Sequence, residues 1–316
     1  MPTQDQTAWI LAQRPPRSTT LDPFKPHAFF LEEPEADATG SISSAAILLT
    51  NKECPWRCLM CDLWKNTTTR SVPPGAIPRQ IDYALAQFRS QPEQIKLYNS
   101  GSFFDPAAIP RADYPAIARR LAFARRIVVE SHPRLVNEKA LLLRDLLCGG
   151  LEVAMGLETV HPQVLPRLNK KFHLTDFARA AAFLRGHGMA VRAFVLLKPP
   201  FLGEAAGVEW AVKSAAYAVS CGATVVSLIP TRPGNGALER LMETGEFSPP
   251  RLSSLETALQ LALEVRAGAR IFADTWNLEP FSHCPACWEK RRRRLQAMNL
   301  AQQFRPAINC PICGEA

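Results

Sequence analysis

Short apolar segments alternate with helical patterns along most of the 316-residue chain, and no other feature constrains the fold as strongly. The candidate strands are Ala45–Leu49, Gln94–Tyr98, Arg126–Glu130, Leu151–Met155, Val191–Leu197 and Thr224–Ile229. The helical patterns between them are Arg79–Arg89, Tyr114–Arg125, Asn137–Cys148, Thr175–His187 and Gly207–Ser220. Such an alternation predicts right-handed βαβ units and a parallel sheet. The sheet would form a partial or open barrel, with a doubly wound sheet as the alternative.

The two ends of the chain differ from this regular middle part. Residues 1–44 are rich in proline, threonine, aspartate and serine without a sustained period, which predicts an extended or partly ordered arm. After Pro230 come two further helical patterns and a last strand: Ala237–Thr244, Arg251–Ala267 and Arg270–Ala273. The expected organisation is an arm over 1–44, an α/β barrel over 45–274 and a small C-terminal module over 275–316.

Charge and composition narrow the class of protein. The formal net charge of +8 favours an anionic partner such as nucleic acid, although solvated surface arginine would account for the same excess. The N-terminal segment shows no secretory signal, and the uncharged stretch 214–231 is interrupted at Cys221 and Gly222. We expect a soluble, cytoplasmic protein without a membrane span. Its nine cysteines then indicate metal binding or catalysis rather than disulfides.

The segment NKECPWRCLMC places Cys54, Cys58 and Cys61 in a loop just after the first candidate strand. In parallel α/β folds ligands bind at the carboxyl ends of the strands, so chemistry is expected in this loop. Thiolates hold iron–sulfur clusters, usually four per cubane, and three thiolates leave one iron free to bind something else. A half-formed zinc site and unrelated buried cysteines are the alternatives.

Two Cys-x-x-Cys pairs near the C-terminus predict a second metal site. Cys284 with Cys287, and Cys310 with Cys313, present four thiolates that complete a tetrahedron around zinc. A second iron–sulfur cluster is the competing assignment, because four cysteines also suit a cubane. Between the pairs, five consecutive basic residues begin at Lys290, and a phosphate backbone would attract them in a salt-dependent manner. Several basic segments of this kind favour RNA over a lone small metabolite.

Cys54, Cys58 and Cys61, in a loop after the first strand of repeated βα units, resemble the motif of the radical S-adenosylmethionine (radical SAM) superfamily. The resemblance implies a partial (β/α)6 barrel of the TIM-like type and a catalytic [4Fe-4S] cluster on these three cysteines. Its open iron is expected to be chelated by the amino and carboxylate groups of S-adenosylmethionine (SAM). With a low-potential electron donor, the reduced cluster then cleaves a carbon–sulfur bond and releases a 5′-deoxyadenosyl radical.

The same resemblance implies residues that bind SAM. The superfamily carries a glycine-containing segment after the second strand, whose backbone binds the methionyl amino group, and Asn99, Ser100 and Gly101 stand in this position. Gly101 suits the role because a close backbone approach to a ligand leaves no space for a Cβ.

Three further candidates come from later strands. Glu158 ends the fourth strand, where the superfamily often places a polar group for the ribose hydroxyls; a capping or surface carboxylate is the alternative. Lys198 and Arg192, from the fifth strand, are candidates to pair with the methionyl carboxylate, although a lysine at a strand end is commonly solvated. One departure from the superfamily is Met60, at a position before the third cysteine that is usually aromatic.

The segments TNKECPWRCLMCDLWKNT, KLYNSGSFFDP and VLLKPPFLGE, together with the C-terminal cysteine pairs, narrow the resemblance to one group. They are similar to the archaeosine synthase radical subunit and its bacterial relatives, which are related to the catalytic subunit of elongator and to tRNA methylthiotransferases. The similarity extends from about Ile47 to Cys313. It implies radical cleavage of a lysine adduct on a 7-deazaguanine base of tRNA, and a partner transferase subunit that attaches the lysine.

Three hypotheses on function remain distinct. The first is a radical SAM enzyme that acts on a modified nucleoside in tRNA. The second is a radical SAM enzyme for a small metabolite or peptide, whose basic segments serve solubility. The third is a non-enzymatic iron–sulfur and zinc protein that binds RNA, and it predicts a cluster that does not respond to SAM. Salt-dependent binding of tRNA would separate the first hypothesis from the second.

Overall fold

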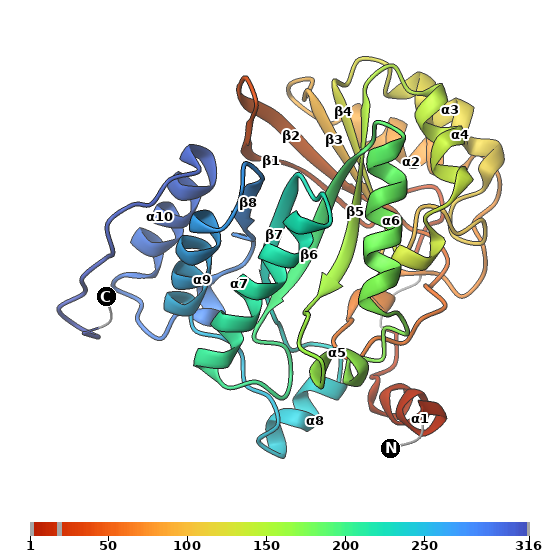
Figure 1. Cartoon of the computed structure of the whole chain (residues 1–316). Coiled ribbons are helices and arrows are strands. Elements are labelled where there is room, and N and C mark those ends of the chain that lie inside the picture. The colour runs from red at the N-terminus through yellow and green to blue at the C-terminus, as the bar shows by residue number, and fades with distance from the viewer. Residues whose placement is uncertain (1–2, 18–20, 315–316) are drawn as a thin grey trace.

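Eight strands form one sheet in the computed structural model, which describes residues 3–17 and 21–314. They follow one another in the sheet in chain order: β1 (Ala28–Asp37), β2 (Gly40–Leu48), β3 (Gln94–Tyr98), β4 (Arg126–Ser131), β5 (Gly150–Glu158), β6 (Ala190–Leu197), β7 (Val225–Pro230) and β8 (Arg270–Ala273). The first strand is antiparallel to β2, whereas β2 to β8 are all parallel. The sheet curls into a nearly closed barrel (Figure 1).

Helices surround this sheet (Figure 1). The α-helices are α1 (Thr3–Gln13), α2 (Ala76–Leu85), α3 (Tyr114–Arg120), α4 (Glu138–Leu146), α5 (Val164–Arg167), α6 (Leu174–Gly186), α7 (Glu204–Ser220), α8 (Ala237–Glu243), α9 (Leu252–Glu264) and α10 (Trp288–Ala301). Four short 3-10 helices are η1 (Leu63–Asn66), η2 (Arg111–Asp113), η3 (Pro133–Leu135) and η4 (Glu279–Phe281). No helix in the described ranges combines the length and the apolar composition that crossing a bilayer requires.

The predicted alternation of strands and helices, and with it the radical SAM type of partial barrel, is confirmed. The segments Gln94–Tyr98 and Arg270–Ala273 are strands with the predicted bounds, and the other five parallel strands contain most of their predicted segments. These strands were predictable because their outer faces carry an unbroken apolar pattern. Six βα units would supply β2 to β7, and the sheet has one further strand at each edge, β1 and β8.

The N-terminal segment differs from the prediction of an extended arm. It contains α1, all of β1 and the start of β2, and Gly40, with φ of 122°, makes the turn between the two strands. The first strand escaped sequence reasoning because Glu32 and Glu35 interrupt its apolar pattern. Pro34 lies at the bulge between these two glutamates, a position that an edge strand tolerates.

The two faces of the parallel strands differ in chemistry. Ile95, Leu97 and Val153 belong to the apolar core beneath the helices, whereas Lys96 and Glu152 project from the opposite face. The interior of this barrel therefore contains buried charged side chains, whereas a complete TIM barrel is filled mostly by branched apolar ones. Such an interior can hold buried charges at both of its ends.

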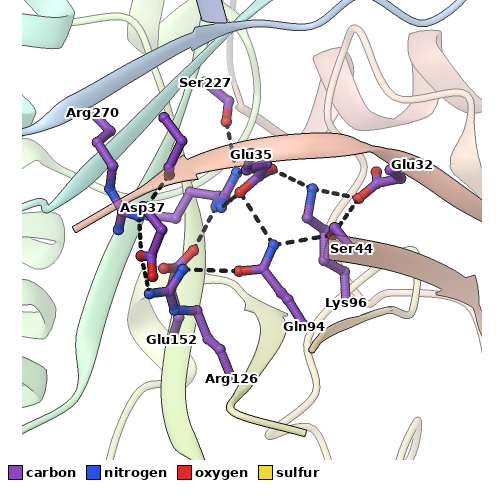
Figure 2. A network of polar contacts seen from close by, with 12 residues as sticks. Glu32, Glu35, Asp37, Ser44, Gln94, Lys96, Arg126, Glu152, Ser227 and Arg270 are labelled. Carbon is purple, nitrogen blue, oxygen red and sulfur yellow. Dashed lines mark hydrogen bonds and ion pairs between the residues drawn. The ribbon is translucent and has the colours of Figure 1, made fainter. Parts of the chain in front are cut away.

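Buried charges close the amino end of the barrel, and Figure 2 shows most of the network. The Lys96 ammonium lies 2.6 Å from Glu32 and 2.5 Å from Glu35 of β1. The Arg192 guanidinium of β6 lies 2.7 Å from Glu35 and 2.6 Å from Glu152 of β5. Each cation therefore meets two carboxylates, and β1 is tied to strands from across the sheet.

The seam between β8 and β1 is closed partly by side chains. Arg270 of β8 donates to the Asp37 carboxylate of β1 at 2.8 Å, and α10 packs against both strands. On α10, the Asn299 side-chain amide bonds the backbone N–H and carbonyl of Ala273, both at 2.8 Å. The Gln302 amide does the same for Ile271, at 2.7 and 2.8 Å. These two amides thus occupy the hydrogen-bonding edge of β8, where a further strand would otherwise pair.

Candidate functional site

The cysteine loop, residues 49–75 between β2 and α2, lies at the carboxyl end of the barrel. Loops from other strands hold its backbone in place. The Leu59 N–H donates to the Leu168 carbonyl at 2.9 Å, and the Asn235 side-chain amide donates to the Leu59 carbonyl at 2.6 Å. Leu168 follows β5 and Asn235 follows β7, so segments far apart in the sequence converge on this loop.

The three cysteines of the loop are half-buried, and the desolvation of their thiols raises their pKa values. Burial raises the pKa of Cys54 to about 11 and that of Cys61 to about 12, and it shifts Cys58 in the same direction. Ionised Cys61 and Cys54 would each oppose the ionisation of Cys58, because like charges repel. A bound cation ionises such thiols outright. Three soft donors in a water-poor setting fit an iron–sulfur cluster.

One buried cation faces these thiols. Lys170, in the loop after α5, directs its ammonium at the Glu158 carboxylate, and its charge favours ionised Cys54 and Cys58. Gly156 gives this ion pair its space, because a Cβ at that position would collide with both side chains. Glu158 follows the bulge that ends β5 and has φ of 65°. The predicted Glu158 thus lies beside the cysteines together with a lysine.

Sequence reasoning missed Lys170. It lies in the loop LNKKF, away from any strand end, and its neighbours Asn169 and Lys171 have φ of 55° and 60°. Left-handed backbone at two non-glycine residues leaves no clear trace in a sequence. The available signal was a pair of lysines in a short loop at the carboxyl end of the sheet.

The predicted segment Asn99–Gly101 follows β3 and touches the cysteine loop. A Cβ on Gly101 would lie 3.2 Å from the Cys54 Cβ, so a side chain there would crowd this contact. The side-chain amide of Asn99 is completely buried, and no residue in 3–17 or 21–314 bonds to its nitrogen or its oxygen. A buried amide of this kind is expected to meet a ligand or water.

Glu130, at the end of β4, organises the same segment. Its carboxylate accepts the backbone N–H groups of Asn99 and Gly101, at 2.5 and 3.4 Å. Ser100 between them has φ of 54°, which helps to turn the donors toward one carboxylate. Burial raises the pKa of Glu130 to about 7, and the backbone donors partly offset this rise. Glu130 is a second residue that sequence reasoning did not single out.

An aromatic stack fixes the first part of the cysteine loop. The rings of Trp56 and His132 lie 3.8 Å apart and nearly parallel, and Phe172 meets His132 edge-on at 5.8 Å. The His132 Nε2 lies 3.0 Å from the backbone carbonyl of Lys170. Burial lowers the pKa of His132 to about 3, so the ring is neutral at physiological pH. The stack therefore joins the cysteine loop to the loop that carries the buried lysine.

Two predicted SAM-binding residues do not join this group. The Lys198 ammonium lies 2.6 Å from the Glu204 carboxylate and 2.8 Å from the Ser248 hydroxyl, which ties β6 to α7 and to the segment before α9. Arg192 lies five residues before the end of β6, within the amino-end network that includes Glu35. Both side chains pair with carboxylates of the protein, and the lysine beside the thiols is Lys170.

Four more cysteines gather around the start of α10 and the C-terminal segment. The ligand atoms of Cys284, Cys287, Cys310 and Cys313 all lie within 4.8 Å of one another. Two of the sulfur pairs are separated by 3.9 Å. A tetrahedral ion with bonds of about 2.3 Å requires sulfur separations of about 3.8 Å. These four residues can therefore hold one metal ion, as the sequence predicted.

Comparison with known proteins decides the family. The archaeosine synthase subunit beta of Thermococcus kodakarensis is 30% identical over 225 residues, which are 69% of this chain and 69% of that protein. The chain belongs to the archaeosine synthase subunit beta family. The protein of the same name from Methanosarcina acetivorans is 27% identical over 249 residues, 73% of this chain and 72% of that one. No family model matches the chain.

The fold agrees with this assignment. A crystal structure of a radical SAM methyltransferase from Sphaerobacter thermophilus matches with a TM-score of 0.55 at 17% identity, over 80% of this chain and 78% of that one. The predicted recognition and the predicted class of radical SAM iron–sulfur enzyme are confirmed.

In this family member the predicted basic segment is a helix whose charges are mostly matched within the molecule. Arg291 and Arg294 of α10 are buried and both pair with Glu256 of α9. Arg292 and Arg293 pair with Glu289 one turn earlier. The segment therefore does not form a continuous basic surface. Its two buried arginines instead attach α10 to the barrel.

Proposed function

We propose that this protein reductively cleaves SAM at a [4Fe-4S] cluster held by Cys54, Cys58 and Cys61, and acts on a 7-deazaguanine-type nucleoside in tRNA. The observation that carries the proposal is the set of three half-buried cysteines beside the buried Lys170–Glu158 ion pair. Three thiolates leave one coordination position for a small-molecule ligand. When bound, the cluster supplies the electron that cleaves the carbon–sulfur bond.

Residues at the carboxyl end of the barrel would position SAM. Gly101 permits a close backbone approach, and the Asn99 amide offers both a donor and an acceptor. Glu158 can accept from ribose hydroxyls, as the sequence predicted. For the methionyl carboxylate we propose Lys170 in place of Lys198 or Arg192, because its ammonium already lies at the thiols.

The tRNA substrate rests on the relatives, which are named archaeosine synthase subunit beta. The relatives are named as one subunit of a synthase, which supports a partner protein. We propose that this partner is a transferase that attaches lysine to the base. A net charge of +8 suits a polyanionic substrate. A low-potential protein electron donor completes the proposed set of partners.

We propose zinc for the C-terminal site of Cys284, Cys287, Cys310 and Cys313. Backbone N–H groups of Cys313 and Ile312 lower the pKa of Cys310 to about 6, which favours the thiolate that a metal needs. A cubane would place each sulfur on a different iron, whereas these sulfurs have the spacing of a single tetrahedron. We also propose that residues 275–316 form the metal-binding module, and that the barrel expected over 45–274 also includes β1 and the start of β2 from the N-terminal segment 1–44.

Electron paramagnetic resonance of the anaerobically reconstituted, reduced protein tests the proposal, with and without SAM. A cubane signal that changes when SAM is added, together with 5′-deoxyadenosine formed under reduction, is the expected result. The Cys148→Ala variant serves as a control, because Cys148 is an exposed cysteine outside both sites. An unchanged signal without cleavage of SAM would refute the proposed chemistry.

A further inference from the structure

One large aromatic side chain at the carboxyl end of the barrel is exposed to solvent. Trp276 follows β8, and 63% of its surface is accessible. Because β8 and β2 are parallel members of one sheet, this tryptophan lies at the same end as the cysteine loop. A tryptophan exposed to this degree is unusual unless it meets a partner.

The backbone that carries Trp276 is firmly held. Its N–H donates to the Asp274 carboxylate at 3.0 Å, and its carbonyl accepts from Arg232 at 2.5 Å. Arg232 also pairs with Asp274 at 2.9 Å, so the loops after β7 and β8 are joined. The Arg232 guanidinium lies 5.6 Å from the centre of the indole and 5.2 Å from that of the buried Phe281. The ring is thus presented from a rigid base rather than from a mobile loop.

A short chain of contacts connects this ring to the cysteine loop. Arg232 opens the segment that continues to Gly234 and Asn235. The Lys65 ammonium of the cysteine loop donates to the Gly234 carbonyl, and Asn235 bonds the Leu59 carbonyl at 2.6 Å. The loop that carries Trp276 is therefore joined to the cysteine loop through the segment that follows β7.

We propose that Trp276 is a stacking platform for an unpaired nucleobase of the RNA substrate. This inference rests on the proposed function, since it assumes an RNA substrate. Every base offers a π-face, so stacking on an aromatic ring tolerates any base sequence. The neighbours of Trp276 along the chain include the exposed polar residues Asn277 and Glu279.

Binding of two fluorescein-labelled RNAs to the full-length, cluster-loaded protein tests this inference by fluorescence anisotropy. One probe is an unmodified tRNA transcript, and the other is a blunt RNA duplex without unpaired bases. Trp276→Ala is expected to weaken tRNA binding about ten-fold and to leave duplex binding unchanged. Trp276→Phe should recover most of the loss. Phe304→Ala is the matched control, because Phe304 is an exposed aromatic in the segment after α10.

The dependence of binding on salt gives a second readout. Stacking releases no counterions, so Trp276→Ala should keep the wild-type slope of log K against log salt. Equal binding by Trp276→Ala and wild type would overturn the inference alone. Equal weakening of both probes, or a wild-type dimer that Trp276→Ala dissociates, would also overturn it. A wild-type protein that binds neither RNA would refute the RNA-directed function as well, so the two failures are distinguishable.

Discussion

The two ends of the barrel hold their buried charges in different ways. At the amino end, Lys96 and Arg192 each lie between two carboxylates, and nearly all of the charge is matched within the protein. At the carboxyl end, Lys170 pairs with Glu158 but also faces thiols, and the buried amide of Asn99 has no partner in the described ranges. The comparison separates charges that stabilise a fold from polar groups arranged for a ligand.

The pKa values of two glutamates are shifted in opposite directions at the two ends: that of Glu35 is lowered at the amino end, and that of Glu130 is raised at the carboxyl end. Burial alone would raise the pKa of Glu35, but Arg192 and Lys96 outweigh it and hold this pKa well below its usual range. The stabilisation from Glu35 is therefore present above pH 4.5 and is lost as pH falls through its folded-state pKa. Glu130 has a raised pKa, so it contributes stability in acid that is lost as pH rises toward about 7.

The largest expected effect comes from removing a thiol at the carboxyl end. Cys58→Ala should abolish the barrel cluster and the activity, because two thiolates cannot hold the cubane, and it should leave the zinc content unchanged. Metal analysis measures the iron and the zinc bound per chain. Cys310→Ala is the matched variant and should do the reverse, since the four-thiolate site contributes directly to folding of its module. Loss of zinc in Cys58→Ala would show that the two sites are not independent.

The next effect tests the amino end. Arg192→Met leaves the Glu152 carboxylate buried without a cation and leaves Glu35 with Lys96 alone, which should lower the free energy of unfolding by about 3–5 kcal/mol. Urea unfolding measures the change, and the iron content should not fall. Arg179→Met, which breaks an ion pair of an arginine whose side chain is 74% exposed, should change stability by less than about 1 kcal/mol. A stable Arg192→Met protein that no longer binds SAM would restore the role first predicted for this residue.

A pH series on Glu130 sharpens the comparison. Between pH 4.5 and about 7 the folded protein binds more protons than the unfolded chain, so the free energy of unfolding should fall as pH rises. Glu130→Gln removes the titrating carboxyl group. The fall in the free energy of unfolding between pH 4.5 and about 7 should therefore be smaller by roughly 3 kcal/mol in the variant. Urea unfolding of the cluster-free protein at several pH values measures it. If the free energy of unfolding changed with pH in the same way in the variant and the wild type, the raised pKa of Glu130 would be contradicted.

The smallest expected effect concerns the aromatic stack on the cysteine loop. Trp56→Ala removes the stack on His132, which should lower the free energy of unfolding by about 1 kcal/mol and speed the loss of iron to a chelator. Trp210→Ala is the control. Trp210 lies on α7, outside the cysteine loop, and its ring centre is 4.4 Å from that of His161. It should destabilise the protein by a similar amount without speeding the loss of iron. Equal rates of iron loss in both variants would show that the stack does not protect the loop.

Sequence reasoning predicted those features that depend on local pattern. The parallel strands, the cysteine spacing and the glycine of Asn99–Gly101 each leave a signature within a short stretch of residues. Lys170 and Glu130 left none, because their roles depend on loops and strands that meet only in the folded chain. The first strand was missed because its inward glutamates find their cations on distant strands. Arg192 and Lys198 were candidates for SAM, and the carboxylates that each meets in the structure, among them Glu152 and Glu204, cannot be read from the sequence.

The helix that covers the edge of β8 has a consequence for the integrity of the whole protein. Asn299 and Gln302 occupy backbone groups that would otherwise pair with a strand from another molecule. Arg291, on the same helix, donates to the Cys287 sulfur at 3.4 Å, which links this cover to the four-cysteine site. In a chain made without metal, we therefore expect the backbone N–H and carbonyl groups of β8 to become exposed and able to pair with a strand of another molecule. Cells short of that metal should accumulate the protein in aggregates rather than as an intact but inactive enzyme.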